Sequence, residues 1–168
     1  MPPANRPVIF KLRSYKPEDF ETLYEIDQLC YEPAIAYSRR ELRNYLSFPG
    51  ADCVVAKAGA KIAGFIVTAS ADAWGYIVTI DVLEAYRRQR LGTLLLARAE
   101  RRLAAKGVRQ VALETATDNT AAIAFWQKHG YRTRGIRKDY YSGGRDAYSM
   151  VKRLNAGAKK ARKGSEAL

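Results

Sequence analysis

The order of the apolar segments along this chain constrains its fold more than any single motif does. Short runs of alternating or continuous apolar residues predict strands, and longer stretches with a 3.6-residue period predict helices. The predicted order, with no internal repeat, is strand, two helices, three strands, helix, strand, helix and two strands. Such a mixed order favours an α+β domain in which one largely antiparallel sheet carries helices on both faces.

Local residue signals give the approximate bounds of these elements. Strands are predicted at 8–13, on both sides of the turn at 58–59, and at 74–82, 108–115, 131–139 and 145–153. Helices are predicted from Pro17, from 38 to about 49, and over 91–105 and 119–129. Ser38 and Glu41 have the spacing of a capping box. Gly107 and Gly130 stand where the last two helices end.

Length and composition are those of one globular domain. The 168 residues, 48% of them hydrophobic, suffice for a single filled core. No apolar run reaches the roughly 20 residues that cross a bilayer, and the amino terminus lacks the pattern of a secretory signal. Two cysteines, Cys30 and Cys53, and a single histidine give neither a disulfide framework nor a metal site. We therefore expect a cytoplasmic protein with no membrane partner and no metal.

A net charge of +12 at pH 7 predicts attraction to an anionic partner, which the charge alone does not identify. Part of this charge lies in residues 155–168, NAGAKKARKGSEAL, which are small and basic and lack apolar periodicity. We expect an ordered domain over 1–154 and a disordered tail over 155–168. The tail is either a solubility feature or an arm that contacts RNA or the ribosome.

A basic turn between two predicted elements is the most distinctive motif of the chain. In DVLEAYRRQRLGTLLLAR, residues 81–98, three arginines and Gly92 stand between a strand and a long helix. The first N–H groups of a helix have no intrahelical acceptor and the helix dipole is positive there, so such a turn can bind phosphate. Arginine adds charge-assisted contacts. The alternative is the solvated start of an ordinary helix, and the Gly-Lys-Ser/Thr of a Walker loop is absent from the sequence.

Three sequence blocks, in order and spacing, resemble the N-acetyltransferases of the GNAT family. The basic turn is similar to the family's acetyl-coenzyme A loop, Gln/Arg-x-x-Gly-x-Gly/Ala, and the likeness runs from about residue 8 to 154. YIVTIDVLEAYRRQRLG, LETATDNTAAIAFWQKHGY and RKDYYSGGRDAYSM resemble the RimI and eukaryotic or archaeal Nα-acetyltransferases in particular. The resemblance implies the GNAT fold, in which the strand 74–82 splays from the strand 108–115, and acetyl-CoA as the cofactor.

The resemblance also implies a set of cofactor-binding residues. The N–H groups of 88–93 would hold the pyrophosphate, and pantetheine would lie along the backbone of Ile80 and Val82, with the Val82 N–H near the thioester oxygen. The residues assigned to the cofactor are Ile80, Val82, Arg87, Arg88, Gln89, Arg90, Leu91, Gly92, Thr93, Asn119 and Phe125. Arg90 departs from the family motif, because it stands where the first glycine is usual. A positive φ would strain an arginine, and we expect helical dihedrals there instead.

The candidate catalytic base is Glu114, which occupies the family's catalytic glutamate position in the segment VALET. An α-amino group titrates at about pH 8 and a lysine at about 10.4, so a single carboxylate acting through water deprotonates an α-amine more easily. The alternative is a surface glutamate paired with a nearby arginine. Tyr76 matches a tyrosine that assists deprotonation in some eukaryotic relatives, or else packs beside Trp74.

Trp126 is the second departure from the family. A tyrosine that acts as a general acid toward the leaving thiolate is usual there, and an indole cannot take that role. Its N–H can still donate one hydrogen bond. Trp126 is therefore either a donor to the thiolate or a large core filler. Asn119 is a good helix cap, and the matching asparagine of the family contacts coenzyme A.

Two segments are expected to form the acceptor site. The resemblance assigns Tyr140 and Tyr141 to the substrate backbone, although neighbouring residues of a strand face opposite sides unless the strand bends. Ala34, Ile35 and Tyr37, ahead of the second helix, are assigned to the opposite wall. The preferred function is acetylation of the N-terminal α-amine of a peptide or protein, of the ribosomal-protein-alanine type. The alternatives are acetylation of a small-molecule amine or lysine side chain, and a catalytically weak GNAT domain that binds RNA or the ribosome.

Overall fold

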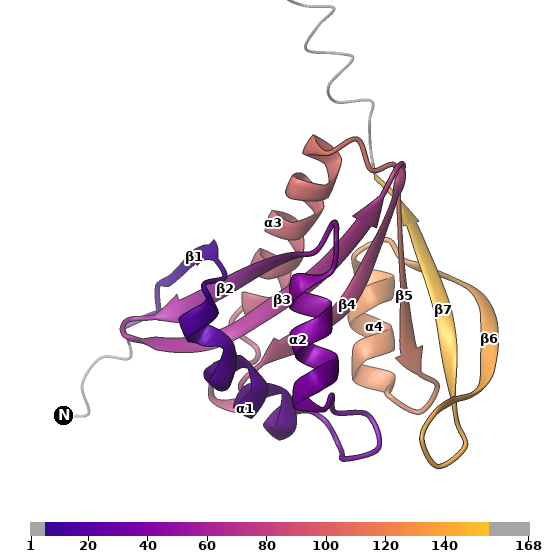
Figure 1. Ribbon diagram of the computed structural model, residues 1–168, viewed down its shortest axis with the longest axis horizontal. Coiled ribbons are helices and arrows are strands. Elements are labelled where there is room, and N and C mark those ends of the chain that lie inside the picture. Colours follow the sequence, from indigo (N-terminus) through magenta and orange to yellow (C-terminus); the bar gives the residue numbers. More distant parts are fainter. Residues whose placement is uncertain (1–5, 155–168) are drawn as a thin grey trace, which may run out of the picture. The chain divides into compact units, whose positions relative to one another are not determined.

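Residues 6–154 of the chain are described by a computed structural model, and they divide into two compact units (Figure 1). The first unit contains the described residues up to Val67 together with Thr79–Ala99, and the second contains Thr68–Val78 and the residues from Glu100 onward. Three elements pass from one unit into the other: the strand β3, Lys61–Ala71, the strand β4, Trp74–Val82, and the helix α3, Leu91–Ala105.

The strands form one mixed sheet. Besides β3 and β4, the described residues contain β1, Phe10–Ser14; β2, Asp52–Ala58; β5, Gln110–Ala116; β6, Arg132–Tyr141; and β7, Arg145–Arg153. These strands build a seven-stranded sheet in the order β1-β2-β3-β4-β5-β7-β6. β1 pairs with β2, and β7 with both β5 and β6, in antiparallel fashion, whereas β4 and β5 are parallel. The prediction of a mixed, largely antiparallel sheet is therefore confirmed.

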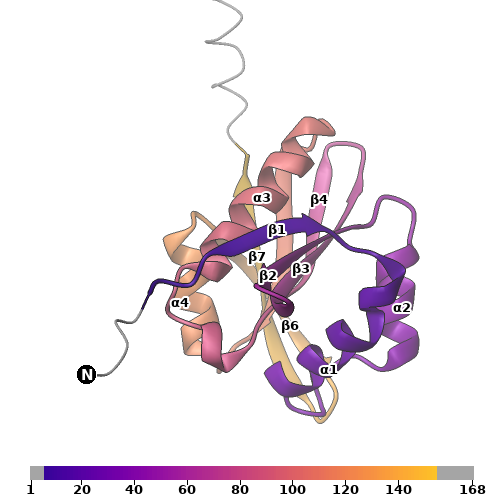
Figure 2. The ribbon, with the colours of Figure 1, turned by 90° about the vertical axis from the view of Figure 1, so that its left-hand side faces the viewer.

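The first unit carries helices on both faces of its strands. The helices α1, Phe20–Cys30, and α2, Arg39–Ser47, lie on one face of β2 and β3, and the beginning of α3 lies on the other (Figures 1 and 2). Leu23, Ile26 and Asp27 of α1 are buried, at the three- and four-residue spacing of a single helix face. An aspartate therefore shares the inner face of α1 with two apolar side chains.

The second unit is built around β5, which pairs along its length with β7. The helix α4, Thr120–Lys128, lies on one face of β5, β7 and β6 (Figures 1 and 2). In this unit β4 pairs with β5 only over Trp74–Tyr76 and Gln110–Ala112, while β5 continues beside β7 to Ala116. The predicted splay of the two strands is thus confirmed, and it begins directly after Tyr76.

Most predicted element bounds agree with the structure to within about two residues. α2 begins at the predicted capping box, in which the Ser38 hydroxyl accepts a hydrogen bond from the Glu41 N–H and the Glu41 carboxylate accepts one from the Ser38 N–H. The first strand starts later than predicted, because Val8 and Ile9 precede the pairing with β2 and are exposed. A short 3-10 turn at Glu84–Tyr86, which was not predicted, separates β4 from α3.

Three sequence-based expectations concern the ends and surroundings of the chain. The tail at 155–168, with its predicted contact to RNA or the ribosome, lies outside the described residues. Between residues 6 and 154, every helix is too short or too polar to cross a bilayer. The same residues contain no group of three or more His, Cys, Asp or Glu side chains that could hold a metal ion.

Candidate active site

A nearly buried carboxylate on β5 is the centre of the candidate site in the second unit. The Glu114 side chain is 6% exposed and accepts a hydrogen bond from the Tyr76 hydroxyl. Its other oxygen lies 3.4 Å from Nε of Arg137 and 3.5 Å from the Ser149 hydroxyl. Glu114 is therefore not a surface glutamate, although the ion pair with an arginine that this alternative expected is present.

Tyr76 is held as a hydrogen-bond donor. Its hydroxyl donates to Glu114 and lies 3.3 Å from the Tyr140 hydroxyl. Burial, and after it the hydrogen bond to Glu114, raises the pKa of Tyr76 well above its ordinary value of 10.0. The phenol therefore stays protonated at neutral pH. This state suits a residue that orients the carboxylate better than one that removes a proton itself.

Tyr140 and Tyr141 lie side by side because β6 bends. The register between β6 and β7 shifts between Arg137 and Tyr141, and Asp139 has a φ of 52°. A regular strand would place two neighbouring side chains on opposite faces. Here the two rings meet edge-on, with centroids 4.9 Å apart and planes at 88°. The bend that both tyrosines need in order to line one groove is therefore present.

The sequence analysis missed two residues of this cluster. Ser149 lies opposite Glu114 in the pairing of β5 with β7. Arg137 belongs to β6, at the edge of the sheet, and its guanidinium lies 5.9 Å from the centroid of the Tyr140 ring. Strand register places Ser149 beside the carboxylate, whereas Arg137 lies two residues beyond Gly135, the β6 residue that pairs with Ser149. The residue types carry no signal of either placement.

The basic turn leads into α3 in the first unit. The Leu94 N–H donates to the Arg90 carbonyl at 3.0 Å, so the helix begins directly after Arg90. The φ angle is 60° at Arg88 and 64° at Arg90, which places both residues in the left-handed region. The expectation of helical dihedrals at Arg90 is therefore wrong. The position has the conformation that the family's usual glycine adopts easily, and arginine is held there at a cost of about 1–2 kcal/mol.

Replacing Arg90 with glycine is expected to raise the free energy of unfolding by about 0.5–1 kcal/mol. Glycine relieves the strain at a φ of 64°. Its greater conformational freedom in the unfolded chain offsets only part of this gain in stability. Arg90→Ala is the matched control, because it removes the same charge but keeps the Cβ atom that causes the strain. Urea denaturation measures both variants, and equal stabilities would contradict strain at this position.

Side chains of the first unit contact the backbone assigned to pantetheine. Nε of Arg87 donates to the Val82 carbonyl at 2.9 Å, and the Tyr31 hydroxyl donates to the Ile80 carbonyl at 2.8 Å. The Cys30 thiol lies 3.5 Å from the same Val82 carbonyl. The Arg87 side chain is therefore folded back onto the end of β4.

The sequence of this chain also matches the pattern of a known family, described as the Acetyltransferase (GNAT) family, over residues 20–131. The chain belongs to this family. The predicted GNAT membership is thereby confirmed, and acetyl-CoA is the acetyl donor that the family uses.

Three similar proteins show how far the likeness extends. The ribosomal protein bS18-alanine N-acetyltransferase of Haemophilus influenzae is 31% identical over 136 residues, covering 76% of this chain and 87% of that protein. The N-alpha-acetyltransferase of Sulfurisphaera tokodaii is 36% identical over 78 residues, 46% of this chain. The match spans about half the length, 47%, of that curated relative. The crystal structure of the ribosomal-protein-S18-alanine N-acetyltransferase from Escherichia coli has a TM-score of 0.80 at 26% identity, covering 89% of this chain and 96% of that one.

In this GNAT chain, Asn119 and Trp126 both have structural roles. Asn119 caps α4, as predicted, because its Oδ1 accepts the Ala122 N–H at 3.1 Å. Trp126 is 5% exposed and packs edge-on against the rings of Phe125 and Tyr131, at centroid distances of 5.0 and 5.3 Å. Core packing accounts for the tryptophan, so its role toward a thiolate stays a prediction, as do the cofactor contacts of Asn119 and Phe125.

The acceptor wall, defined as Ala34, Ile35 and Tyr37, lies between α1 and α2 in the first unit and is half-buried. The Tyr37 ring packs against Tyr45 of α2 with centroids 5.0 Å apart. The Tyr37 N–H donates to the Asp27 carboxylate at 2.8 Å. The backbone of the wall is therefore held by a buried residue of α1.

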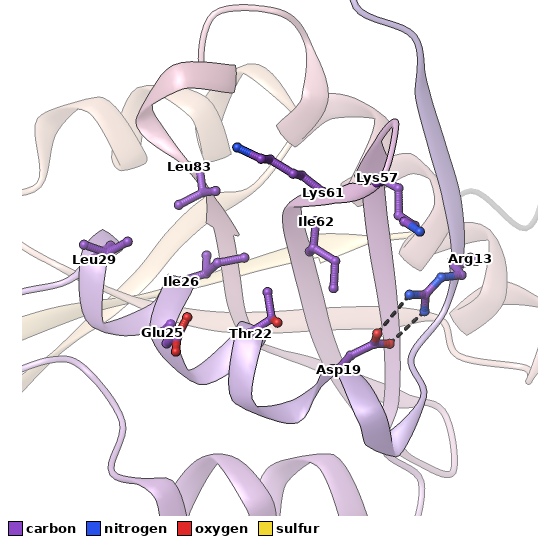
Figure 3. Close-up of a pocket in the computed structure, with 11 residues that line it drawn as sticks. Arg13, Asp19, Thr22, Glu25, Ile26, Leu29, Lys57, Lys61, Ile62 and Leu83 are labelled. Atoms are coloured by element: carbon purple, nitrogen blue, oxygen red, sulfur yellow. Dashed lines mark hydrogen bonds and ion pairs between the residues drawn. The ribbon is translucent and has the colours of Figure 1, made fainter.

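A cavity of about 500 Å³ lies in the first unit between α1 and the hairpin of β2 and β3 (Figure 3). At its edge the Arg13 guanidinium donates two hydrogen bonds, of 2.7 and 2.9 Å, to the Asp19 carboxylate. Ile26, Ile62 and Lys61 are among the residues that line it. The lining contains none of the residues assigned to catalysis, to the cofactor or to the acceptor.

The predicted site residues divide between the units. The second unit contains the carboxylate cluster, in which Tyr76 contacts both Glu114 and Tyr140. The first unit contains the basic turn and the acceptor wall. Trp126, the third residue assigned to catalysis, packs in the aromatic core of the second unit.

Proposed function

We propose that this chain transfers the acetyl group of acetyl-CoA to the N-terminal α-amine of a peptide or protein, with N-terminal alanine as the narrower acceptor class. The observation that carries the proposal is the carboxylate cluster. Glu114 is nearly buried and fixed by Tyr76, and it lies beside the exposed side chains of Tyr140 and Arg137. The likeness to an N-alpha-acetyltransferase and to bS18-alanine N-acetyltransferases supports the acceptor class.

The basic turn supports the donor side of the proposal. Left-handed residues at Arg88 and Arg90 alternate with Gln89, and successive backbone N–H groups in such a turn can converge on an anion. The turn leads into the first turn of α3, where the helix dipole is positive. In the proposed complex these N–H groups and the exposed guanidinium groups hold the pyrophosphate of acetyl-CoA.

The proposed reaction is a direct transfer. Acetyl-CoA supplies an acetyl group activated as a thioester; the amine nitrogen bonds to the acetyl carbon, the carbon–sulfur bond breaks, and the sulfur leaves as a thiolate. The amine must lose a proton, and Glu114 takes it through one water molecule. Tyr76 keeps the carboxylate oriented by its hydrogen bond. In the proposed complex the Val82 N–H would donate to the acetyl oxygen, where negative charge develops.

An α-amine suits a site with a single proton acceptor. An α-amino group has a pKa of about 8, whereas that of lysine is about 10.4, so neutralising a lysine at pH 7 costs about 3 kcal/mol more. The hydroxyls of Tyr76 and Tyr140 are 3.3 Å apart beside the carboxylate and can bond to the backbone of a bound peptide. These features favour a peptide amino terminus over a lysine side chain.

A panel of short peptides incubated with acetyl-CoA tests this proposal. Acetylation, followed by mass spectrometry, is expected on peptides that begin with alanine, serine or methionine. The same peptides with a blocked amino terminus and a free lysine side chain are the control and should stay unmodified. Calorimetry with coenzyme A is run in parallel. Inactivity toward all free amino termini, with coenzyme A binding intact, would contradict the acceptor class.

A further inference from the structure

Two aspartates of the first unit are buried and have no part in the proposed chemistry. Asp27, on the inner face of α1, is 0% exposed, and Asp81, on β4, is 1% exposed. Asp81 stands between Ile80 and Val82, whose backbone is assigned to pantetheine. An ionised carboxylate is costly to bury unless it is paired or protonated. Both side chains therefore need a physical explanation.

One oxygen of each carboxyl group has a donor. Asp27 Oδ2 accepts the Tyr37 N–H at 2.8 Å, and Asp81 Oδ1 accepts the Thr79 hydroxyl at 2.5 Å. Across residues 6–154, the other two oxygens, Asp27 Oδ1 and Asp81 Oδ2, are the buried side-chain atoms left without a donor or acceptor. Each carboxyl group acts on the pKa of the other, so the two buried groups lie close together. Since ionised carboxylates only accept hydrogen bonds, a bond between these two oxygens requires one proton between them.

The charges around the pair favour retention of that proton. Burial, and after it the negative charge of Asp27, raises the pKa of Asp81 well above its ordinary value of 3.8. Burial also raises the pKa of Asp27, and the Glu41 carboxylate of α2 acts in the same direction, while the Tyr37 N–H opposes it. The Arg87 guanidinium lowers the pKa of Asp81 but does not outweigh burial.

On one side the pair holds the acceptor wall. The Tyr37 N–H donates to Asp27, and the Tyr37 carbonyl accepts a hydrogen bond of 2.8 Å from Nε2 of Gln28. Two consecutive residues of α1 therefore bind both backbone polar groups of Tyr37. The position of the wall depends on where the Asp27 carboxyl group lies.

On the other side the same end of α1 contacts β4. The Tyr31 hydroxyl donates to the Ile80 carbonyl at 2.8 Å, and the Cys30 thiol lies 3.5 Å from the Val82 carbonyl. Burial raises the pKa of Cys30 to about 11 and that of Tyr31 well above 10.0, so both remain neutral donors at physiological pH. Ile80 and Val82 of β4 are therefore held by the last residue of α1 and by Tyr31, which directly follows it.

We propose that Asp27 and Asp81 share one proton, and that this hydrogen bond positions the acceptor wall against β4. Both are positioning residues, because neither is placed at a reacting atom. Asp27 acts through Tyr37, and Asp81 acts through the backbone of its own strand. The proposal rests on the proposed function, which makes the wall and β4 the elements that border acceptor and donor.

Two substitutions of Asp81 separate the shared proton from simple packing. Asp81→Asn has the same shape and keeps an N–H donor toward Asp27, so the wall should stay in place. Asp81→Leu has similar bulk but no donor, and it leaves the Asp27 charge buried without its partner. Asp19→Asn is the matched control, because Asp19 is also a buried carboxylate of the first unit but is bound to Arg13.

Infrared spectroscopy and hydrogen exchange test the pair without any acceptor. A protonated carboxyl group has a C=O band that carboxylates lack. This band is expected at pH 7 in the wild type and in Asp19→Asn, and it should be lost in Asp81→Asn. Exchange of the Tyr37 N–H should be slow in the wild type and in Asp81→Asn, and about tenfold faster or more in Asp81→Leu. Absence of the acid band from the wild type would overturn the shared proton.

Kinetics with an acceptor peptide tests the positioning role. Asp81→Leu is expected to lower kcat/KM by about 10²-fold, because a wall displaced by about 1 Å misplaces the amine. Asp81→Asn should restore the rate, and Asp19→Asn should keep it. Wild-type kcat/KM in folded Asp81→Leu would overturn the positioning role. If the wild type acetylates no peptide, the proposed function fails, and exchange at Tyr37 still decides whether the pair holds the wall.

If Asp81→Leu does not fold, the pH dependence of wild-type stability tests the shared proton instead. Because the pKa of Asp81 in the folded chain lies above the ordinary 3.8, its stabilising effect is complete below about pH 4 and is lost as the pH rises through the folded value. Over that window the folding equilibrium constant falls by up to about tenfold per pH unit, and Asp81→Asn should remove this slope. Loss of the acid band and faster exchange at Tyr37 should share one midpoint, and different midpoints would overturn the proposal.

Discussion

Replacing Glu114 with glutamine is expected to lower kcat/KM for an N-terminal peptide by about 10²- to 10⁴-fold. Glutamine has nearly the same shape, and its carbonyl oxygen can still accept the hydrogen bond from Tyr76 that fixes this side chain. It cannot take up the proton of the amine, so the loss should fall on kcat. Coenzyme A binding, measured by calorimetry, should stay unchanged.

Two further variants show whether such a loss belongs to the proton acceptor. Asp118→Asn removes an exposed carboxylate of the same unit, which pairs with Arg145 at 2.6 Å, and it is expected to leave kcat unchanged. Tyr76→Phe keeps the Glu114 carboxylate but removes its donor, so a smaller loss is expected. Full activity of Glu114→Gln would remove this residue from the mechanism, even if acetylation of peptides were established.

Elements with strong apolar periodicity and a clear terminator could be predicted almost residue by residue. Leu91, Leu95 and Ala99 lie on the buried face of α3, and Gly107, with a φ of 89°, follows the end of the helix. The bounds of β4 and β7 were likewise predicted from residues within each segment. Because these signals are contained within each segment, the bounds of the three elements could be predicted without any knowledge of tertiary contacts.

The parts of the site that were not predicted depend on backbone conformations that residue type does not reveal. Arg88 and Arg90 are left-handed although arginine gives no sign of it, whereas a glycine at either position would have done so. Asp139, with a φ of 52°, marks the bend of β6. Aspartate tolerates this conformation better than most residues, and the strand was predicted to end at this position. Neither the residue type nor the predicted end shows that the strand continues beyond the bend.

Partners across the sheet could not be predicted, because register is a property of two segments and not of one. Ser149 is opposite Glu114 only through the pairing of β7 with β5. The buried carboxyl groups are a second example. Asp27 lies at a helix position typical of core residues, but its side chain is of a charged type that is usually exposed. Asp81 stands near the end of a predicted strand, where a polar residue is not unusual. That each acts on the pKa of the other becomes apparent only when α1 and β4 are placed together.

Replacing Trp126 with alanine is expected to lower the free energy of unfolding by about 3–5 kcal/mol. The side chain is 5% exposed and packs edge-on against Phe125 and Tyr131, so truncation leaves a cavity in the second unit and removes two aromatic contacts. Trp74→Ala is the matched control, because the same side chain is lost from a position that is 50% exposed, and it should cost much less. Equal losses in urea denaturation would contradict the core role of Trp126.

The companion variant Trp126→Phe decides between the two interpretations of this residue. Phenylalanine keeps an aromatic ring in the core but lacks the N–H group that could donate to a thiolate. A thiol with a pKa of about 8.5 is a tolerable leaving group at neutral pH, so we expect kcat to stay within about threefold of the wild type. A loss of kcat by about tenfold or more, with coenzyme A binding and stability retained, is the effect of one missing hydrogen bond to a charged atom. That outcome would place the indole N–H at the leaving sulfur and make Trp126 a catalytic residue after all.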